Sequence, residues 1–277
     1  MAKELATALV HSRPRFWLYT AGPFLVGYGA GAADLWSFAS PIFIYGFVYF
    51  LIFANVFLYG VNDVFDLDTD VHNPKKRGPE RHAVGVRKSL AVWAAASAAL
   101  AAPLFIDATS AAYVLAFLAL SFIYSAPPIR LKSRPFLDSY SNWLYIVPAG
   151  LGYYLASGHH MPLWAWAAGV FWTAGMHALS AVPDIEADKA AGVKTVATAL
   201  GRRGTMAFVA LNWLATASIL TYVDILLAPS FIYFAIALYL TAAPDRVETW
   251  YWRFPLINSA MGAGAFIYAT RWIIPGF

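Results

Sequence analysis

Long apolar runs separated by short polar connections dominate the pattern of this chain. A helix that crosses a bilayer needs roughly 17 or more predominantly apolar residues, because it rises ~1.5 Å per residue through about 30 Å of hydrocarbon. The sequence therefore predicts nine spans, near residues 15–33, 40–61, 89–106, 110–125, 139–157, 162–181, 205–223, 225–243 and 256–274. We expect an all-α membrane protein that forms a single polytopic domain over residues 1–277.

The composition agrees with this pattern and excludes several classes of function. The chain is 60% hydrophobic and only 12% charged, which does not describe a soluble globular domain. It contains no cysteine, which excludes disulfides, thiolate metal sites and cysteine nucleophiles. Because no basic stretch lies clear of the predicted membrane segments, we expect membrane lipid, and no nucleic acid, as a partner.

The basic residues predict the orientation of the chain. In the nine-span arrangement every lysine and arginine except Arg271 falls on the side of the N-terminus. The positive-inside rule then places the N-terminus and the long loops in the cytoplasm. The opposite loops are short, and their adjacent histidines, His159 and His160, are interpreted as a solvated external turn in preference to a metal site.

A first acidic cluster follows the second predicted span. The stretch from Gly60 to Asp70 holds four aspartates within eight positions, in a chain with 15 acidic residues. If the helix continues through it, Asp63, Asp66 and Asp70 share one face with Asn62 nearby, and Asp68 points away. Carboxylates crowded on one face repel each other unless a cation lies between them. An oxygen-rich set without sulfur or imidazole favours Mg2+ as that cation.

A second acidic cluster follows the sixth predicted span. Asp184 and Asp188 are four residues apart and share a helical face, with Glu186 turned away. Four predicted spans separate the two clusters, and an even number returns the chain to the same side of the membrane. We therefore expect both clusters at the cytoplasmic surface.

A basic segment lies between the two clusters in the sequence. Pro127-Pro128 is predicted to end the fourth span, and Arg130, Lys132 and Arg134 follow at alternate positions. In an extended segment this alternation places the three cations on one edge. Ordinary anchoring at the membrane surface is an equally open interpretation of each residue.

Two carboxylate clusters with basic residues nearby hold more negative charge than one metal ion requires. They suit two or three Mg2+ ions that bridge to a diphosphate. An apolar helical bundle at the same place indicates a lipid diphosphate, whose isoprenoid tail enters the bundle. Metal and basic side chains would neutralise the departing diphosphate, so that an allylic C–O bond ionises. The 17% aromatic content could line a dry cavity for the carbocation.

The paired motifs, Asn62-Asp63-x-x-Asp66-x-x-x-Asp70 and Asp184-x-x-x-Asp188, resemble those of the UbiA superfamily of intramembrane prenyltransferases. The resemblance implies a ring of nine transmembrane helices around a central cavity, with a cytoplasmic cap made by the motif-bearing loops. It implies metal ligation and catalysis by the carboxylates, foremost Asp63, Asp66 and Asp184. The expected metal ligands are Asn62, Asp63, Asp66, Asp70, Asp184 and Asp188, and the expected diphosphate contacts are Asn62, Tyr124, Arg130, Lys132, Arg13 and Lys194.

Finer features resemble one branch of that superfamily, the lycopene elongases. They are the stretch His11-Ser12-Arg13-Pro14-Arg15-Phe16-Trp17, the Ala21-Gly22-Pro23 that follows it, and Asn73-Pro74-Lys75-Lys76. This resemblance implies that dimethylallyl diphosphate donates its prenyl group to the ends of a lipophilic acceptor, lycopene. The resulting cation would then lose a proton or take up water.

Other functions stay open at this point. The same fold could prenylate an aromatic quinone precursor, a porphyrin or a glycerol-phosphate lipid, although residues 73–80 depart from the quinone-type pattern. An ion-coupled transporter is a different class, because intramembrane acids often mark ion pathways. The aspartates here cluster at helix ends, which argues against transport. The polar residues within the spans are expected to make interhelical hydrogen bonds; they are Asn55, Asn142, His177, Asn212 and Asn258.

Overall fold

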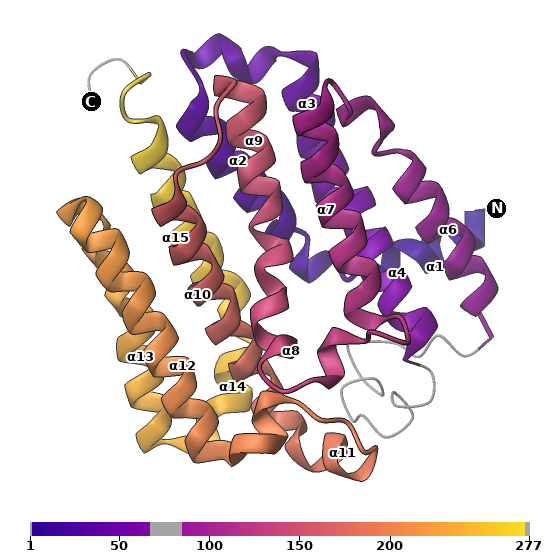
Figure 1. The fold of residues 1–277 in the computed structure, drawn as a ribbon, viewed down its shortest axis with the longest axis vertical. Helices are drawn as coiled ribbons and strands as arrows, with labels where there is room; N and C mark the ends of the chain where they lie inside the picture. Colours follow the sequence, from indigo (N-terminus) through magenta and orange to yellow (C-terminus); the bar gives the residue numbers. More distant parts are fainter. Residues whose placement is uncertain (1, 67–84, 275–277) are drawn as a thin grey trace. The chain divides into compact units, whose positions relative to one another are not determined.

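The computed structural model describes residues 2–66 and 85–274. Every regular element within these residues is a helix (Figure 1). The chain packs as two compact units that are each assembled from separate stretches of sequence. Unit 1 comprises residues 1–130, 147–161 and 262–277, and unit 2 comprises residues 131–146 and 162–261.

Unit 1 contains seven complete α-helices among the described residues and the end of α15. They are α1 (Ala2–His11), α2 (Leu18–Gly31), α3 (Pro41–Val48), α4 (Ala54–Phe65), α6 (Arg87–Ala99), α7 (Ala108–Ser125) and α9 (Val147–Ser157). Helix α2 packs along α9 at glycine contacts, a common device in membrane helices. A Cβ atom on Gly152 would lie 2.5 Å from the carbonyl oxygen of Phe24, so a larger residue would push the two helices apart.

A π-helical turn, Tyr49–Phe53, joins α3 to α4 in one continuous helical run. Such a turn leaves backbone carbonyls without their usual helical partners. Asn55 Nδ2 donates to the carbonyl oxygens of Phe50 (2.9 Å) and Leu51 (3.1 Å), and also to Thr20 Oγ1 on α2 (2.7 Å). The turn is thus stabilised by a buried amide that also ties α4 to α2, which confirms the interhelical role expected of Asn55.

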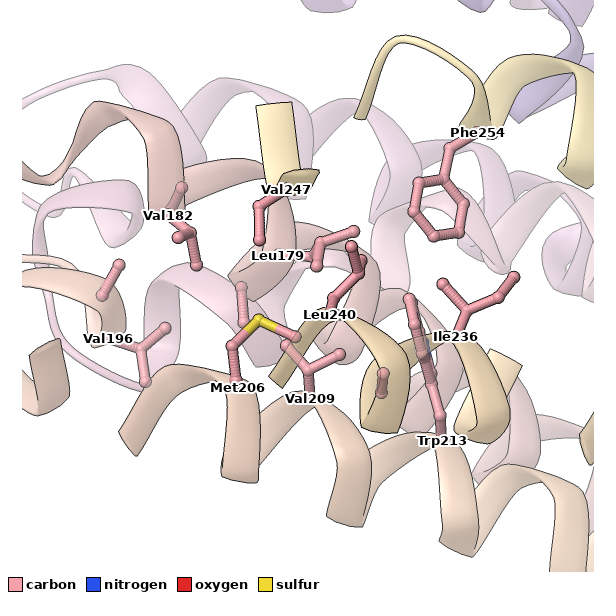
Figure 2. Packing of buried hydrophobic residues seen from close by; sticks show 14 of the residues in the cluster. Leu179, Val182, Val196, Met206, Val209, Trp213, Ile236, Leu240, Val247 and Phe254 are labelled. Atoms are coloured by element: carbon pink, nitrogen blue, oxygen red, sulfur yellow. The ribbon is translucent and has the colours of Figure 1, made fainter. Parts of the chain in front are cut away.

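Unit 2 is built around one hydrophobic core. Its helices are α8 (Leu137–Tyr140), α10 (Leu163–Ala181), α11 (Ile185–Ala190), α12 (Val196–Val223), α13 (Phe231–Ala242), α14 (Val247–Tyr251) and the first part of α15 (Phe254–Thr270). Figure 2 shows Met206, Val209 and Trp213 of α12 in this core beside side chains of α10 and α13. Trp213 is fully buried, and its Nε1 donates to the carbonyl oxygen of Trp172 on α10 (3.2 Å).

Four helical segments are long and apolar enough to cross a membrane. They are Pro41–Phe65, Ala108–Ser125, Val196–Val223 and Ile225–Ala242. They coincide with the predicted second, fourth, seventh and eighth spans. The other five predicted spans overlap α2, α6, α9, α10 and α15. The nine-helix ring and the cytoplasmic cap stay predictions.

Two local expectations were wrong. The predicted span 139–157 is interrupted, since α8 and a 3-10 helix (Ser141–Tyr145) precede α9. Pro148 at the start of α9 explains the break, because proline lacks an N–H and clashes with the preceding turn. The segment after Pro127-Pro128 is not extended either. Arg130 has a positive φ of 43°, and a 3-10 helix (Leu131–Ser133) follows it, so alternate residues do not share an edge.

Candidate active site

The first carboxylate cluster lies at the C-terminal end of α4. Asp63 is in the last turn, and Asp66 is the C-cap residue with φ −106° and ψ 5°. The helix therefore ends at Phe65. The expectation that it continues through Asp66 was wrong. Both carboxylates are nonetheless buried, with 1% and 5% of their surface exposed. Asp68 and Asp70, the other acids of this motif, lie outside the described residues.

Both oxygens of Asp63 bind side chains that precede α2. His11 Nδ1 donates to Oδ2 (2.7 Å), and Arg13 Nη2 donates to Oδ1 (3.0 Å). Arg13 also reaches Asn62 Oδ1 (3.4 Å), and its guanidinium lies over the ring of Tyr59, 4.6 Å from the centroid. The structure thus places Arg13, an expected diphosphate contact, at the first motif.

His11 was not predicted as a site residue. It is 5% exposed, and its imidazole shares Asp63 with Arg13. In the sequence it stands out only as the first residue of the stretch His11–Trp17 that resembles the lycopene elongases. No spacing rule connects that position with Asp63, which lies 52 residues further along the chain.

The end of α7 and the loop after it complete this cluster. Asn62 Nδ2 donates to Ser125 Oγ at the last position of α7 (3.1 Å). Arg130 Nη2 lies 3.4 Å from Asp66 Oδ1. Tyr124, another predicted diphosphate contact, is half-buried beside Ser125. Unit 1 therefore brings together two aspartates, an asparagine and two arginines that the sequence predicted from three separate stretches.

One buried donor in this cluster could bind an anion, although the charges of its two arginines and two aspartates balance. Arg13 and Arg130 face the two aspartates, so the repulsion expected of the carboxylates is offset by guanidinium groups. Arg130 Nε is buried, and no described atom accepts a hydrogen bond from it. A buried donor without an acceptor is costly, and a phosphate oxygen is a suitable acceptor for it.

The donor atoms also suit Mg2+, because carboxylate and amide oxygens are its usual protein ligands. Among the described residues, no group of three or more acidic, histidine or cysteine side chains is arranged to hold a metal ion alone. Asp70, one of the six expected ligands, is outside those residues. The fit therefore rests on the chemistry of the donors: oxygen atoms of Asn62, Asp63 and Asp66.

The second carboxylate cluster lies in unit 2. Asp184 ends a 3-10 helix (Val182–Asp184) that follows α10 and is the N-cap residue of α11, which contains Asp188. Both are half-buried. The Glu186 side chain, in contrast, is 87% exposed, and its Oε1 lies 3.3 Å from Lys189 Nζ. Two predicted diphosphate contacts belong to the same unit: Lys132, which is half-buried, and Lys194, which is exposed.

A buried aspartate and a histidine also lie in unit 2, and neither was predicted as a site residue. Asp138 on α8 has no exposed surface, and its Oδ2 accepts from the backbone N–H of Val196 (2.9 Å). His177 Nε2 on α10 lies 3.7 Å from the same oxygen. Burial raises the pKa of Asp138 to about 6, although the Val196 N–H acts in the opposite direction. The sequence shows these two residues 39 positions apart with no motif around them.

Comparison with known proteins identifies the family of this chain. The model of the UbiA prenyltransferase family matches residues 19–269. The chain belongs to the UbiA prenyltransferase family. It is therefore a prenyltransferase and an integral membrane protein, which confirms the enzyme class indicated by the paired aspartate motifs and leaves transport without support.

Relatives named lycopene elongase/hydratase cover nearly the whole chain. The one from Halobacterium salinarum is 45% identical over 261 residues, which is 91% of this chain and 93% of the relative. The one from Haloferax volcanii is 44% identical and covers 95% of this chain and 88% of the relative. A more distant one from Corynebacterium glutamicum is 33% identical over 80% of this chain and 78% of the relative.

Solved structures of UbiA homologues share the fold. A homologue from Archaeoglobus fulgidus, bound to DMAPP and Mg2+, superposes with a TM-score of 0.69 at 24% identity over 94% of this chain and 98% of that one. An apo homologue from Aeropyrum pernix K1 gives a TM-score of 0.69 at 18% identity over 94% and 97%. At these identities the structures establish the fold of this family member.

Proposed function

We propose that this protein transfers a dimethylallyl group from dimethylallyl diphosphate to the ends of lycopene, in a reaction that requires Mg2+. The assignment of lycopene as the acceptor rests on the 41–45% identity to three relatives named lycopene elongase/hydratase, over nearly their full lengths. The assignment of an allylic diphosphate as the donor is supported by the cluster of Arg13, Arg130 and buried aspartates in unit 1.

The diphosphate chemistry is assigned to the residues that the sequence predicted for it. Arg13 and Arg130, with Tyr124, Lys132 and Lys194, bind the diphosphate and stabilise the charge that develops as the allylic C–O bond breaks. Mg2+, when bound, neutralises phosphate oxygens and makes diphosphate a better leaving group. Its proposed ligands are Asn62, Asp63, Asp66, Asp70, Asp184 and Asp188.

The acceptor supplies the electron pair for the new bond. A terminal double bond of lycopene attacks the allylic carbon, and the positive charge passes to the tertiary carbon next to the new C–C bond. That cation loses a proton to give an alkene, or takes up water to give an alcohol. No side chain has to form a covalent bond with either substrate.

The remaining features of the proposal concern the protein in the membrane. The distribution of lysine and arginine supports a cytoplasmic N-terminus and cytoplasmic motif loops. Residues 1–277 then act as one prenyltransferase domain, with its helices arranged as a ring around a cavity and capped on the cytoplasmic side. A rigid hydrocarbon longer than the bilayer core is thick requires that cavity to open towards lipid.

The test uses cells that make lycopene and express this chain. We expect carotenoids heavier than lycopene by one and two five-carbon units, with or without added water. Purified protein in lipid, supplied with Mg2+ and dimethylallyl diphosphate, should give the same products. If lycopene stays unchanged while a hydroxybenzoate, a dihydroxynaphthoate or a glycerol-phosphate lipid is prenylated, the acceptor is wrong and only the family assignment stands.

A further inference from the structure

The buried pair in unit 2, Asp138 and His177, has the form of an oriented base. Asp138 is fully buried, and 21% of the His177 side chain is exposed. His177 Nε2 is the nitrogen that faces the carboxylate, at 3.7 Å from Oδ2. A carboxylate at this position favours the tautomer with hydrogen on Nε2, which makes Nδ1 the basic nitrogen.

The cost of burying Asp138 argues that the pair has a use beyond packing. Its Oδ2 accepts one hydrogen bond, from the N–H of Val196 at the start of α12, while no described atom donates to its buried Oδ1. A neutral asparagine could accept the Val196 hydrogen bond equally well at a lower cost of desolvation. Backbone N–H groups, including those of Val196 and Ser139, favour the ionised carboxylate. His177 Nε2 is the side-chain nitrogen that lies beside it, 3.7 Å from Oδ2.

The position of His177 relates it to the second carboxylate motif. His177 precedes Asp184 by seven residues, along α10 and the 3-10 turn that continues it. Seven residues are close to two helical turns, so both lie on the same side of this run, with His177 about 10 Å from Asp184 along the helix axis. If Asp184 helps to hold the diphosphate as proposed, His177 lies two turns along α10 from that contact.

We propose that His177, positioned by Asp138, accepts the proton of the water molecule that hydrates the elongated carotenoid cation. The inference rests on the proposed function, and it assigns the choice between alcohol and alkene products to this pair. His177 is the proposed general base, and Asp138 is a positioning residue.

The atoms of this step balance without a further reagent. Water oxygen forms a C–O bond to the tertiary cation, one O–H bond breaks, and the proton passes to His177 Nδ1. The imidazolium that results is stabilised by the carboxylate of Asp138. The net reaction joins lycopene, dimethylallyl diphosphate and water into an alcohol, diphosphate and one proton. Without the base, the cation loses a proton from a neighbouring C–H and yields the alkene.

The experiment compares products of the full-length protein in lipid with Mg2+, dimethylallyl diphosphate, lycopene and H2(18)O. The variants are His177→Asn, which keeps a polar side chain but cannot take a proton, the longer His177→Gln, and Asp138→Asn, which keeps an acceptor for Val196. His159→Asn makes the same substitution at an exposed histidine outside the pair. Thermal unfolding of each purified variant selects those that fold.

We expect the wild type and His159→Asn to form alcohols labelled with 18O. In His177→Asn and His177→Gln the ratio of alcohol to alkene should fall by about tenfold or more, with lycopene still consumed, because general-base catalysis contributes ~100-fold or more. Asp138→Asn should lower the ratio less. A loss of packing alone would slow both products together and leave their ratio unchanged.

Three results would overturn the inference: an unchanged ratio in both His177 variants, a loss of all lycopene consumption in folded His177 variants, or a wild type that makes alkenes only. Failure of the wild type to act on lycopene at all would overturn the proposed function, and this inference with it. The wild-type reaction thus tests the proposed function, and the variant reactions test the role of His177.

Discussion

The contact between Arg13 and Asp63 gives a quantitative prediction about the first motif. The two atoms, Nη2 and Oδ1, are 3.0 Å apart, and the side chains are 17% and 2% exposed. At an effective dielectric constant of ~20 the Coulomb attraction is about 5 kcal/mol, and desolvation of both groups offsets most of it. We expect a net coupling of about 2 kcal/mol, which is typical of a hydrogen bond to a charged group.

A double-mutant cycle measures this coupling. The variants are Arg13→Gln, Asp63→Asn and the two combined, and the readout is thermal unfolding in detergent followed through the 11 tryptophans. Asp63→Asn should cost about 3–5 kcal/mol, because Arg13 and His11 both lose a buried charged partner. Since ~1 kcal/mol shifts the melting temperature by about 2–4 °C in a chain of this size, the singles and the double should deviate from additivity by roughly 4–8 °C.

The matched control is a cycle on Arg202 and Asp245. This pair joins the same residue types at 3.7 Å, but its side chains are 50% and 97% exposed. Exposed ion pairs contribute about 0–1 kcal/mol, so these variants should be nearly additive. If the Arg13–Asp63 cycle is additive, or no larger than this control, the reasoning from burial and distance is refuted.

Three further predictions test the metal, the packing and the electrostatics. Prenyl transfer should vanish with EDTA and return with Mg2+. Asp66→Ala should abolish prenyl transfer, whereas Glu186→Ala, which removes an exposed acid, should reduce it only slightly; equal losses would contradict the assigned roles. Gly175→Ala should destabilise the protein by about 1–3 kcal/mol in denaturation experiments, because its Cβ would lie 2.5 Å from Trp213 Nε1; an unchanged melting temperature would show that Trp213 can move. The Tyr154 hydroxyl and the N–H of Ser110 lower the pKa of Asp107. Its ionised form therefore stabilises the start of α7 at any pH above the ordinary aspartate pKa, and this stabilisation is lost as the pH falls through the lowered pKa. The melting temperature of Asp107→Asn, which keeps a capping group, should therefore lie below wild type at pH 7 and approach it at pH 3; a gap independent of pH would exclude the charge as its cause.

The sequence by itself determined the class of the protein and the place of its motifs. Apolar runs predicted a helical membrane protein, since the length of a span and the cost of burying backbone polar groups in lipid act locally along the chain. Pro127-Pro128 correctly marked the end of α7, because proline excludes a helical residue before it. The concentration of aspartates at Asn62–Asp70 and Asp184–Asp188 indicated a site for Mg2+ and a diphosphate. The spacing of these residues resembles the motifs of the UbiA superfamily, and that resemblance indicated the family.

The tertiary structure decided which side chains meet. His11 reaches Asp63 across 52 residues, and Asp138 approaches His177 across 39. Neither contact has a periodicity or a spacing that a single sequence reveals. The π-turn at Tyr49–Phe53 is equally hidden, since Thr20 on a different helix helps to satisfy its carbonyls. Hydropathy and turn propensity act between neighbours in sequence, whereas a buried hydrogen bond requires two distant segments to be packed within about 3 Å of each other.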